Sequence, residues 1–470
     1  ILVIIILLRR IFAANFIGFM STDIRIKNGL SINIKGVADK ELKKVPLPTQ
    51  LALILDDFHL IVPKLLVKEG QSIKRGQPIF YSKSNEEIKF VSPSSGVIEK
   101  IIRGDRRKII EILIKTDKKD LKIKHKIPNL NNLKKDQVVK LLLESGCWPF
   151  IKQRPFDIIA NPDEKPKSIH VSCFDSAPLS VDYEFILKDR MDLFKAGLDV
   201  LEIICPKNVN LGIKKSQTFF KEQLSNYKST VFEGPHPSGN VGVQIHHVNP
   251  ISSGESVWIL KPEDVCTIGN LFLEGEYIPT RTIAVSGPPV KNPKYFRTII
   301  GAKIESILKN INFQKNQSLR LINGDVLSGK SVGIDKFIGF YNNNLSILKE
   351  GNHFKLFGWI PFINNSVPSI YRSSFNWLSS SKPKEYDTNL NGEERAFVVT
   401  GEMEKVFPMD IYPMQLVKEC MIGNIEKMER LGIYEVAPED FGLIDYASSS
   451  KIEAQTIVRN GIDFLIKETL

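Results

Sequence analysis

The stretch LLVKEGQSIKRGQPIF, residues Leu65–Phe80, sets the architecture of the first part of the chain. Gly70 and Gly76 fall between short segments in which apolar and polar residues alternate. This pattern predicts short strands joined by turns. A second stretch, FVSPSSGVIEKII (Phe90–Ile102), has the same character. We therefore expect a β domain of short strands over residues 20–135.

The two stretches resemble the barrel-sandwich hybrid of biotinyl and lipoyl carrier domains. A carrier domain needs a modified lysine at the tip of the hairpin between them, and that tip here lies near Ser84–Glu87 (SNEE). Lys83 and Lys89 are nearby but lack the Asp-Lys-Ala or Met-Lys-Met context of a carrier lysine. The resemblance therefore implies the fold without the carrier function.

Helix-like and strand-like segments alternate over residues 136–255. Residues 136–146 (DQVVKLLLESG) are apolar at helical spacing and end in glycine, which predicts a helix. Beyond it the pattern predicts strands at residues 168–174 and 200–206, and helices at residues 181–197 and about 214–226. This alternation is typical of a parallel, Rossmann-like α/β unit.

The rest of the chain divides into a strand-rich part and a helical part. Strand patterns at residues 257–270, 281–287 and 318–324 predict a β-grasp-like domain over residues 256–385. Residues 364–392 are rich in Ser, Asn, Pro and Lys, which predicts a long loop. Helical patterns at residues 414–423, 425–432 and 453–470 predict a helical domain over residues 386–470. The fold class expected is thus mixed α/β and β, in several domains.

Composition narrows the function classes. The chain has 470 residues, 42% of them apolar and 25% charged, which is typical of globular proteins. The net charge of +11 fits nucleic acid or an anionic membrane face, but the lysines are spread evenly, so we predict no nucleic-acid binding. The five isolated cysteines form no CxxC motif, which disfavours a disulfide framework, a zinc ribbon or a ferredoxin-type cluster and suits a reducing compartment.

Residues 1–19 begin with the apolar run Ile1–Leu8, which Arg9 and Arg10 follow. The run is too short to span a bilayer, and a signal peptide carries its positive charges before the apolar run. We interpret residues 1–19 as a non-native upstream extension, since Met20 opens a more convincing start; a short interfacial anchor is the alternative.

One motif points to a different function. Residues Gly324–Ser331 read GDVLSGKS and match the phosphate-binding loop G-x-x-x-x-G-K-[ST]. Such a loop needs a helix after it, but the following residues include Gly333 and Gly339 and end rich in aromatic residues and asparagine, which disfavours a helix. A turn between two strands is therefore the favoured interpretation, and a P-loop nucleotide-binding protein is the alternative.

Two segments supply candidate binding residues. Residues 146–157 (GCWPFIKQRPFD) place aromatic rings beside cations, which indicates either a buried aromatic cluster or a stacking platform for a flat ring with polar oxygens. Residues 231–250 (VFEGPHPSGNVGVQIHHVNP) hold three histidines in a Gly- and Pro-rich segment, without the ligand spacing of a metal site. The candidate residues from the two segments are Trp148, Phe150, Arg154, Phe156 and His236.

From about Ile24 to the C-terminus, a series of phrases resembles the NqrA-type component of the bacterial sodium-translocating NADH:quinone oxidoreductases. The most distinctive are FDSAPL (Phe174–Leu179) and GPHPSG (Gly234–Gly239) with the following GVQIHH, and further phrases include RTIAVSGPPVKNP (Arg281–Pro293) and INGDVLSGK (Ile322–Lys330). Each phrase alone is weak, and together, in this order, they are specific. The P-loop match falls on one of these phrases.

The resemblance implies a peripheral subunit on the cytoplasmic face of the bacterial inner membrane, with five partner subunits. The complex would couple NADH oxidation and ubiquinone reduction to sodium export, and this component would bind no cofactor and hold no complete active site. FAD, FMN, iron–sulfur clusters and NADH would belong to the partners, through which the chain would meet the membrane.

The resemblance extends to flavin- and cluster-bearing subunits of respiratory complexes, and here the sequence departs from them. Where they carry a Gly-rich flavin loop, residues 146–155 hold bulky side chains, and Leu443–Gln455 lacks their cluster cysteines. We therefore expect a degenerate flavin site at residues 136–255. The five candidate residues are hypothesised to line the quinone head-group site; a ligand-free assembly scaffold is the second alternative.

Overall fold

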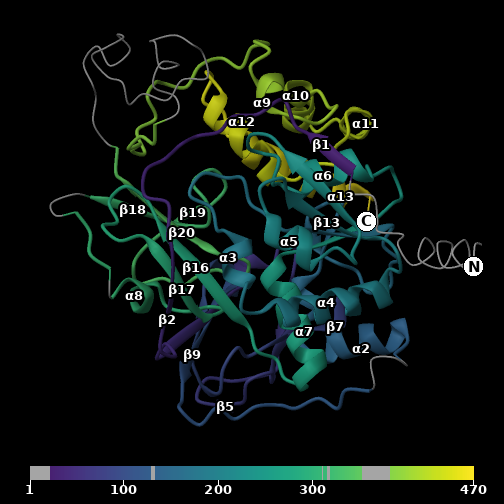
Figure 1. The fold of residues 1–470 in the computed structure, drawn as a ribbon, viewed down its shortest axis with the longest axis vertical. Helices are drawn as coiled ribbons and strands as arrows, with labels where there is room; N and C mark the ends of the chain where they lie inside the picture. Colours follow the sequence, from purple (N-terminus) through teal and green to yellow (C-terminus); the bar gives the residue numbers. More distant parts are fainter. Residues whose placement is uncertain (1–21, 129–132, 310, 315–317, 352–381, 470) are drawn as a thin grey trace, which may run out of the picture.

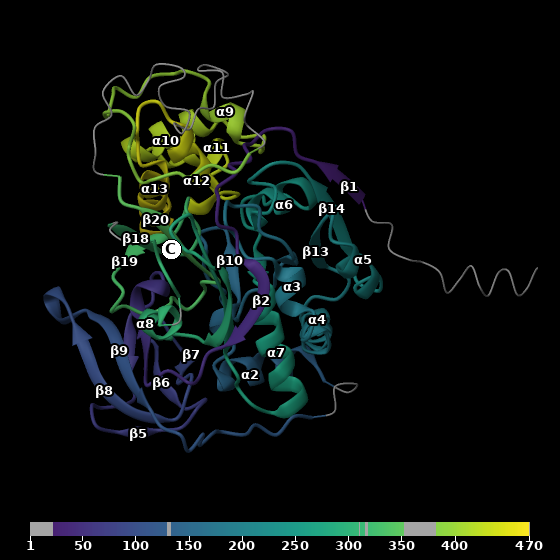
Figure 2. The same ribbon diagram turned by 60° about the vertical axis from the view of Figure 1, so that its left-hand side comes forward.

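The computed structural model describes residues 22–128, 133–309, 311–314, 318–351 and 382–469. These residues form four sheets and a group of C-terminal helices, which confirms the mixed α/β, multidomain class. Figures 1 and 2 show the C-terminal helices at the top, above the α/β unit and the strand-rich unit, and the barrel strands lie at the lower left of Figure 2. The predicted extension at residues 1–19 lies outside the described residues, as does most of the loop predicted at residues 364–392.

The first unit is built from two small sheets, and its strands run from residue 50 to residue 116. One sheet has the order β3-β9-β8-β5 and the other β4-β6-β7. The strands are β3 (Gln50–Ile54), β4 (Pro63–Leu65), β5 (Ser72–Ile73), β6 (Pro78–Ser82), β7 (Asn85–Val91), β8 (Gly96–Arg103) and β9 (Ile109–Thr116). Gly70 and Gly76 both have φ near +80°, where an L side chain would be strained, so the two predicted turns are confirmed.

The segment before residue 50 pairs with strands outside the two barrel sheets. We assigned it to the barrel-sandwich domain, but β1 (Thr22–Arg25) pairs in parallel with β14 of the α/β sheet. β2 (Asp39–Lys44) pairs with β17 of the third sheet. The chain therefore ties three units together before it enters the barrel, through strand pairing that no local pattern reveals.

The second unit is a seven-stranded sheet in the order β1-β14-β13-β12-β15-β10-β11. From β1 to β15 neighbouring strands pair in parallel, and β10 and β11 form an antiparallel edge. The strands are β10 (Lys152–Arg154), β11 (Ile158–Ile159), β12 (Ser168–Ser172), β13 (Val209–Lys214), β14 (Ser229–Glu233) and β15 (Val257–Leu260). The helices are α2 (Lys135–Ser145), α3 (Tyr183–Leu187), α4 (Met191–Ile204), α5 (Thr218–Gln223), α6 (Val241–Val248) and α7 (Pro262–Glu274).

The helix predicted at residues 136–146 is confirmed, and its Gly146 caps α2 in the left-handed conformation. Two other predictions in this unit are wrong. Residues 200–204, predicted as strand, continue α4, because Val200, Leu201 and Ile204 bury one face of a long amphipathic helix. Residues 262–270, predicted within a strand, belong to α7, and Pro262 at its first turn starts the helix.

The position of α7 also moves a boundary. β15 and α7 belong to the α/β unit, so this unit extends past the predicted limit at residue 255. Helices α4 and α7 cross closely at two glycines. A Cβ on Gly269 would collide with the carbonyl oxygen of Leu193, and one on Gly197 with that of Val265.

The third unit is a six-stranded mixed sheet in the order β19-β18-β20-β16-β17-β2. Its own strands are β16 (Thr280–Ser286), β17 (Lys294–Ile299), β18 (Leu319–Asn323), β19 (Lys330–Val332) and β20 (Asn344–Lys349), with the short helix α8 (Ile304–Leu308). The strands predicted near residues 281–287 and 318–324 are confirmed. One continuous core runs through the first three units.

The C-terminal helices have a core of their own, into which Ile26, Phe174, Phe232 and Val243 of the preceding chain also pack. The helices are α9 (Met403–Val406), α10 (Pro413–Ile422), α11 (Ile425–Arg430), the 3-10 turn η6 (Pro438–Phe441), α12 (Gly442–Ala447) and α13 (Ala454–Thr469). The three predicted helices correspond to α10, α11 and α13, while η6 and α12 were not predicted.

Candidate functional site

The candidate site lies at the carboxyl edge of the parallel sheet. The chain passes from β12 through β13 to β14 on one side, and β15 then returns to the other side of β12. In open α/β sheets, ligands bind in the crevice outside the carboxyl ends of the strands at such a reversal. Two distinctive phrases follow strands at this edge: FDSAPL comes after β12 and GPHPSG after β14.

The two loops are joined by hydrogen bonds around Ser176. Its Oγ lies 3.0 Å from His236 Nδ1 and accepts a 2.8 Å bond from the backbone N–H of Gly239. Gly239 has to be glycine, because a Cβ there would lie 2.5 Å from Ser176 N. The phrases thus encode one clasp between the ends of β12 and β14, on either side of β13, and this clasp positions His236.

His236 is almost fully buried in this clasp, at 5% exposure. Burial lowers its pKa to about 4, although the carboxylates of Asp325 and Asp440 act in the opposite direction. The ring is therefore neutral at physiological pH. With Nδ1 engaged by Ser176, the ring nitrogen that a ligand could use is Nε2.

Arg154 lies at the end of β10, and its side chain is completely buried. Its Nη1 donates to Asp440 Oδ2 at 2.9 Å, and its Nη2 donates to Glu439 Oε1 at 2.7 Å. Burial acts to lower the pKa of Arg154, but the two carboxylates outweigh it and hold the pKa above its usual value. Both acids come from η6, so this ion pair fastens the C-terminal helices to the edge of the α/β sheet.

The crevice is filled by later parts of the chain. Lys261, at the end of β15, donates to the carbonyl oxygen of Tyr341 at 2.9 Å. The β18–β19 hairpin brings Asp325 toward Asp175, and burial together with Asp325 raises the pKa of Asp175 to about 7. From η6, the carbonyl oxygen of Glu439 accepts a 3.2 Å bond from the Asn240 side chain. Three of the distinctive phrases therefore meet at one place, and the chain itself covers it.

Phe156 lies beside this place, two residues after Arg154. Its backbone is left-handed, with φ +83°, and its ring meets Tyr434 of the C-terminal unit edge-on at 6.1 Å. Its carbonyl oxygen accepts a 2.9 Å bond from Arg459 Nη1. Phe156 is partly exposed, unlike Arg154.

Trp148 and Phe150 do not form an open stacking platform, so the prediction of accessible rings is corrected for these two residues. Trp148 is fully buried, donates from its indole nitrogen to the carbonyl oxygen of Ala160 at 2.8 Å, and meets Trp258 edge-on. Phe150 stacks against Phe340 with centroids 4.9 Å apart. The barrel, the α/β sheet and the third unit meet around these rings, and both rings pack against apolar side chains of this shared core. Both rings belong to the main hydrophobic core, which matches the buried-cluster interpretation of this segment.

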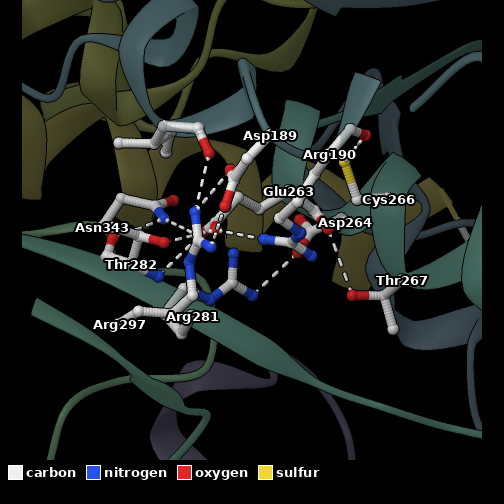
Figure 3. Close-up of polar contacts among 11 residues, drawn as sticks. Asp189, Arg190, Glu263, Asp264, Cys266, Thr267, Arg281, Thr282, Arg297 and Asn343 are labelled. Carbon is white, nitrogen blue, oxygen red and sulfur yellow. Dashed lines mark hydrogen bonds and ion pairs between the residues drawn. The ribbon is translucent and has the colours of Figure 1, made fainter. Parts of the chain in front are cut away.

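The structure adds a buried polar cluster that the sequence did not single out (Figure 3). Glu263 and Asp264 occupy the first turn of α7, directly after the carboxyl end of β15. Glu263 Oε1 pairs with Arg190 at 2.7 Å, and Asp264 Oδ1 pairs with Arg281 of β16 at 2.7 Å. Asn343 donates to Glu263 Oε2 at 2.7 Å. The Pro-Glu-Asp sequence after an apolar strand is a helix-start signal that could have located these acids.

This cluster joins the α/β unit to the third sheet. Arg190 and Glu263 come from the α/β unit, whereas Arg281 and Asn343 come from the third unit. Within the cluster, Arg281 Nε and Nη1 and Asp264 Oδ2 are buried and have no hydrogen-bond partner among the protein atoms of the described residues. Donors and acceptors that face one another in this way suit internal water molecules.

Residues 324–331 form a hairpin and no nucleotide-binding loop. Asp325 Oδ1 accepts from the backbone N–H groups of Leu327 and Ser328 at 2.7 and 3.0 Å, which fixes the turn. Lys330 and Ser331 then begin β19, paired antiparallel with β18, so a strand and not a helix follows the loop. The strand-turn interpretation is confirmed, and the P-loop alternative is wrong.

The other histidines of the GPHPSG region serve structural contacts. His246 Nδ1 lies 2.8 Å from Glu435 Oε2, which links α6 to the C-terminal unit. His247 Nδ1 lies 2.9 Å from the carbonyl oxygen of Val243, one turn earlier in the same helix. Across the residues that the structure describes, no group of three or more His, Cys, Asp or Glu side chains is placed to hold a metal ion. All five cysteines are buried free thiols.

Comparison with known proteins gives three family matches along the chain. Residues 24–117 match the family described as NqrA N-terminal barrel-sandwich hybrid domain, residues 133–277 the NqrA second alpha/beta domain, and residues 282–333 the NQRA C-terminal domain. The first match supports the barrel-sandwich hybrid. The second match includes β15, which belongs to the seven-stranded sheet, and the helix α7 that follows it.

The curated relatives match over their full length. The A-type component of the Na(+)-translocating NADH-quinone reductase of Neisseria meningitidis serogroup B is 32% identical, and the match covers 95% of this chain and all of that protein. The proteins of the same name from Hahella chejuensis and Pasteurella multocida are 34% and 33% identical, with the same coverage.

Likeness to solved structures is weak. A NAD+-reducing [NiFe]-hydrogenase in the air-oxidized state overlays with a TM-score of 0.37 at 9% identity, covering 73% of this chain and 62% of that chain, which is too distant to bear on function. No helix in the described part of the chain is both long and apolar enough to cross a bilayer. The agreement of the three domain matches with the full-length relatives shows that this chain belongs to the NqrA family of the sodium-translocating NADH-quinone reductases.

Proposed function

We propose that this chain is the quinone-side, cofactor-free peripheral subunit of a complex that couples NADH oxidation and ubiquinone reduction to sodium export. The observation that carries the proposal is the match of nearly the whole chain to NqrA relatives that are named as part of that reductase. We place the chain at the cytoplasmic face of the bacterial inner membrane, with five partner subunits that carry NADH, FAD, FMN and iron–sulfur chemistry. No complete active site would then be present on this chain alone.

The charge of the crevice supports the absence of a flavin. A flavin nucleotide would bring its phosphates to the carboxyl edge of the sheet, at the reversal between β12 and β15. Asp325 faces that edge beside Asp175, and Arg154, the buried cation there, is already paired with Glu439 and Asp440, so a phosphate would meet like charge in a poorly solvated site. The residues present therefore do not fit a nucleotide cofactor, and we derive no step through one.

In this proposal the α/β unit is a Rossmann-like domain with a degenerate flavin site. Its strand order and the loops at the carboxyl edge of its sheet fit that origin, and the third unit is assigned as β-grasp-like. We propose domain limits close to residues 45–128 for the barrel, 133–277 for the α/β domain with β1 added, 280–351 for the third domain with β2 added, and 382–469 for the helical domain.

We propose that the quinone head group binds where Phe156, Arg154 and His236 converge on η6. A quinone is uncharged and flat, so its recognition needs an aromatic face and hydrogen-bond donors for two carbonyl oxygens. Phe156 supplies the face, and His236 Nε2 and Arg154 supply the donors. Because η6 covers Arg154, entry requires that Pro438–Phe441 move away. Trp148 and Phe150 act indirectly, by anchoring in the core the segment that leads into β10 and Arg154.

The first experiment is purification of the tagged chain from native membranes in mild detergent, followed by assay of NADH:ubiquinone activity with and without sodium. Co-purification of flavin- and iron–sulfur-bearing partners, with activity that rises with sodium, supports the proposed function. If the chain elutes alone and carries no associated activity, the proposal fails.

The quinone site needs a separate test in the assembled complex. Phe156→Ala and His236→Gln should raise the KM for ubiquinone, while NADH oxidation with an artificial acceptor stays at the parent rate. Leu273→Ala, an exposed site on α7, is the matched control. Unchanged quinone kinetics in both variants would instead favour the ligand-free scaffold.

A further inference from the structure

Five large apolar side chains are exposed where the barrel-sandwich unit meets the C-terminal helices. Leu60 and Val62 follow the 3-10 turn η1 (Leu55–Asp57), Met421 and Ile422 end α10, and Phe464 lies on α13. Their exposures run from 39% for Phe464 to 72% for Ile422. We call these five residues the apolar face. Soluble monomers rarely expose large apolar side chains together, and such groups mark interaction sites.

Two contacts bring the parts of the apolar face together. His59, the neighbour of Leu60, places its Nε2 2.7 Å from Asp463 Oδ1, and Asp463 precedes Phe464. On the other side, a Cβ on Gly423 would lie 3.4 Å from Cε1 of Phe464, and Gly423 follows Ile422. Phe464 therefore connects the barrel side of the face to the α10 side.

Cations border the apolar face. Lys64 is exposed two residues after Val62, and Lys467 is exposed nearly one turn after Phe464. Lys108 pairs with Asp56 of η1 at 2.8 Å, which ties the β8–β9 hairpin to this side of the barrel. At the end of that hairpin, Arg106 and Arg107 are both exposed. Figure 2 shows the hairpin projecting from the body of the molecule.

An apolar face bordered by lysine and arginine fits an anionic phospholipid surface. The apolar side chains would enter the boundary between headgroups and acyl chains, and the cations would meet the phosphates. Protein interfaces, by contrast, are depleted of lysine relative to the rest of the surface. We propose that the apolar face docks this chain directly onto an anionic bilayer. The proposal goes beyond attachment through partner subunits and does not depend on the quinone site.

The test is co-sedimentation of the purified full chain with two kinds of vesicle, one of phosphatidylcholine alone and one of phosphatidylcholine with an equal amount of phosphatidylglycerol. We expect binding to the anionic vesicles that salt weakens. Val62→Glu combined with Ile422→Glu should lower this binding by about tenfold or more, because apolar area is lost and two charges are added that the headgroups repel. The matched control is Leu273→Glu, an exposed leucine on α7 outside the apolar face, which should bind like the parent.

A second variant tests the cations and protects against misfolding of the first. Arg106→Glu with Arg107→Glu changes only an exposed hairpin end, and it should weaken binding to anionic vesicles and flatten the salt dependence. Each protein is measured as the full chain and as the chain that starts at Met20, so binding by residues 1–19 does not hide the effect. The proposal is overturned if the parent that starts at Met20 binds neither vesicle, or if both variants bind like the parent.

Discussion

Asp440→Leu should strongly destabilise the attachment of the C-terminal helices to the α/β sheet. Asp440 and Arg154 are both fully buried and paired at 2.9 Å. Without Asp440, Arg154 keeps its ion pair with Glu439, whose side chain is 43% exposed and therefore partly screened by water, and the electrostatic attraction of Asp157. Breaking a buried ion pair from one side costs about 3–5 kcal/mol, and Asp440 Oδ2 also accepts the 2.9 Å bond that caps η6 at Ala437 N. We therefore expect a loss near the upper end of that range.

A double variant, in which both members of the ion pair are replaced, separates the energy of the ion pair from the energy of the packing around it. Leucine has nearly the shape of aspartate, and Arg154→Met with Asp440→Leu removes both charges at once. Replacing a buried pair by apolar residues is often close to neutral, so the double variant should be less destabilised than the sum of the single variants by at least about 2 kcal/mol. The measurement is urea unfolding followed by circular dichroism, with hydrogen exchange in α13 to report the C-terminal unit alone. Single variants that each lose less than about 1 kcal/mol, or losses that simply add, would refute a buried, coupled pair.

Three further predictions concern other parts of the described chain. Asp175→Asn should flatten the dependence of the unfolding free energy on pH. The pKa of Asp175 is raised to about 7 in the folded state, so its protonated carboxyl stabilises the fold at pH 4, and this stabilisation is lost as pH rises through 7. Unfolding midpoints at several pH values will measure the difference. Cys147 and Cys266, with pKa values raised to about 12 by burial, should react with a thiol reagent only after unfolding, and rapid labelling of the native protein would contradict their burial. Gly269→Ala should destabilise the chain by about 1–3 kcal/mol in urea unfolding, because its Cβ meets the α4 backbone, and an unchanged unfolding midpoint would contradict the close crossing of α4 and α7.

The sequence predicted elements whose signals are local. The turns at Gly70 and Gly76, the end of α2 at Gly146 and the helices α10, α11 and α13 all follow from glycine placement or helical spacing over a few residues. Fold class was predictable for the same reason, because alternating helix and strand patterns in the middle of the chain imply parallel pairing.

Elements were mispredicted where two signals competed. Residues 200–204 (VLEII) have the β-branched content of a strand, but the apolar spacing that begins at Met191 continues through them, and burial of that face decides for helix. For β1 and β2, the local sequence carries too little signal to show which strand each one pairs with. Each pairs with a strand about two hundred residues later or more, so their location depends on partners that no local window contains.

The candidate site was only partly predictable. The sequence indicated Arg154, Phe156 and His236, and the structure places Arg154 and His236 around one carboxylate, Asp440. Asp440 itself was not predicted, since a Pro-Glu-Asp-Phe sequence in a helical region gives no sign of a partner nearly three hundred residues earlier. Aromatic composition was misleading for Trp148 and Phe150, because a ring that suits a ligand platform suits a core equally well.

Under the proposed function, the convergence of these phrases would explain how one scaffold loses a nucleotide cofactor and keeps a site. FDSAPL, GPHPSG and the GDVLSGK hairpin meet at the sheet edge, where the hairpin brings Asp325 near Asp175 and His236. An edge that carries carboxylates repels phosphate, yet a neutral histidine and a paired arginine at the same edge can still donate hydrogen bonds to an uncharged ring. The same acids also hold the C-terminal helices through Arg154, so opening the site and loosening those helices become one event. Access of quinone would then depend on the strength of the Arg154–Asp440 pair, which the double variant measures.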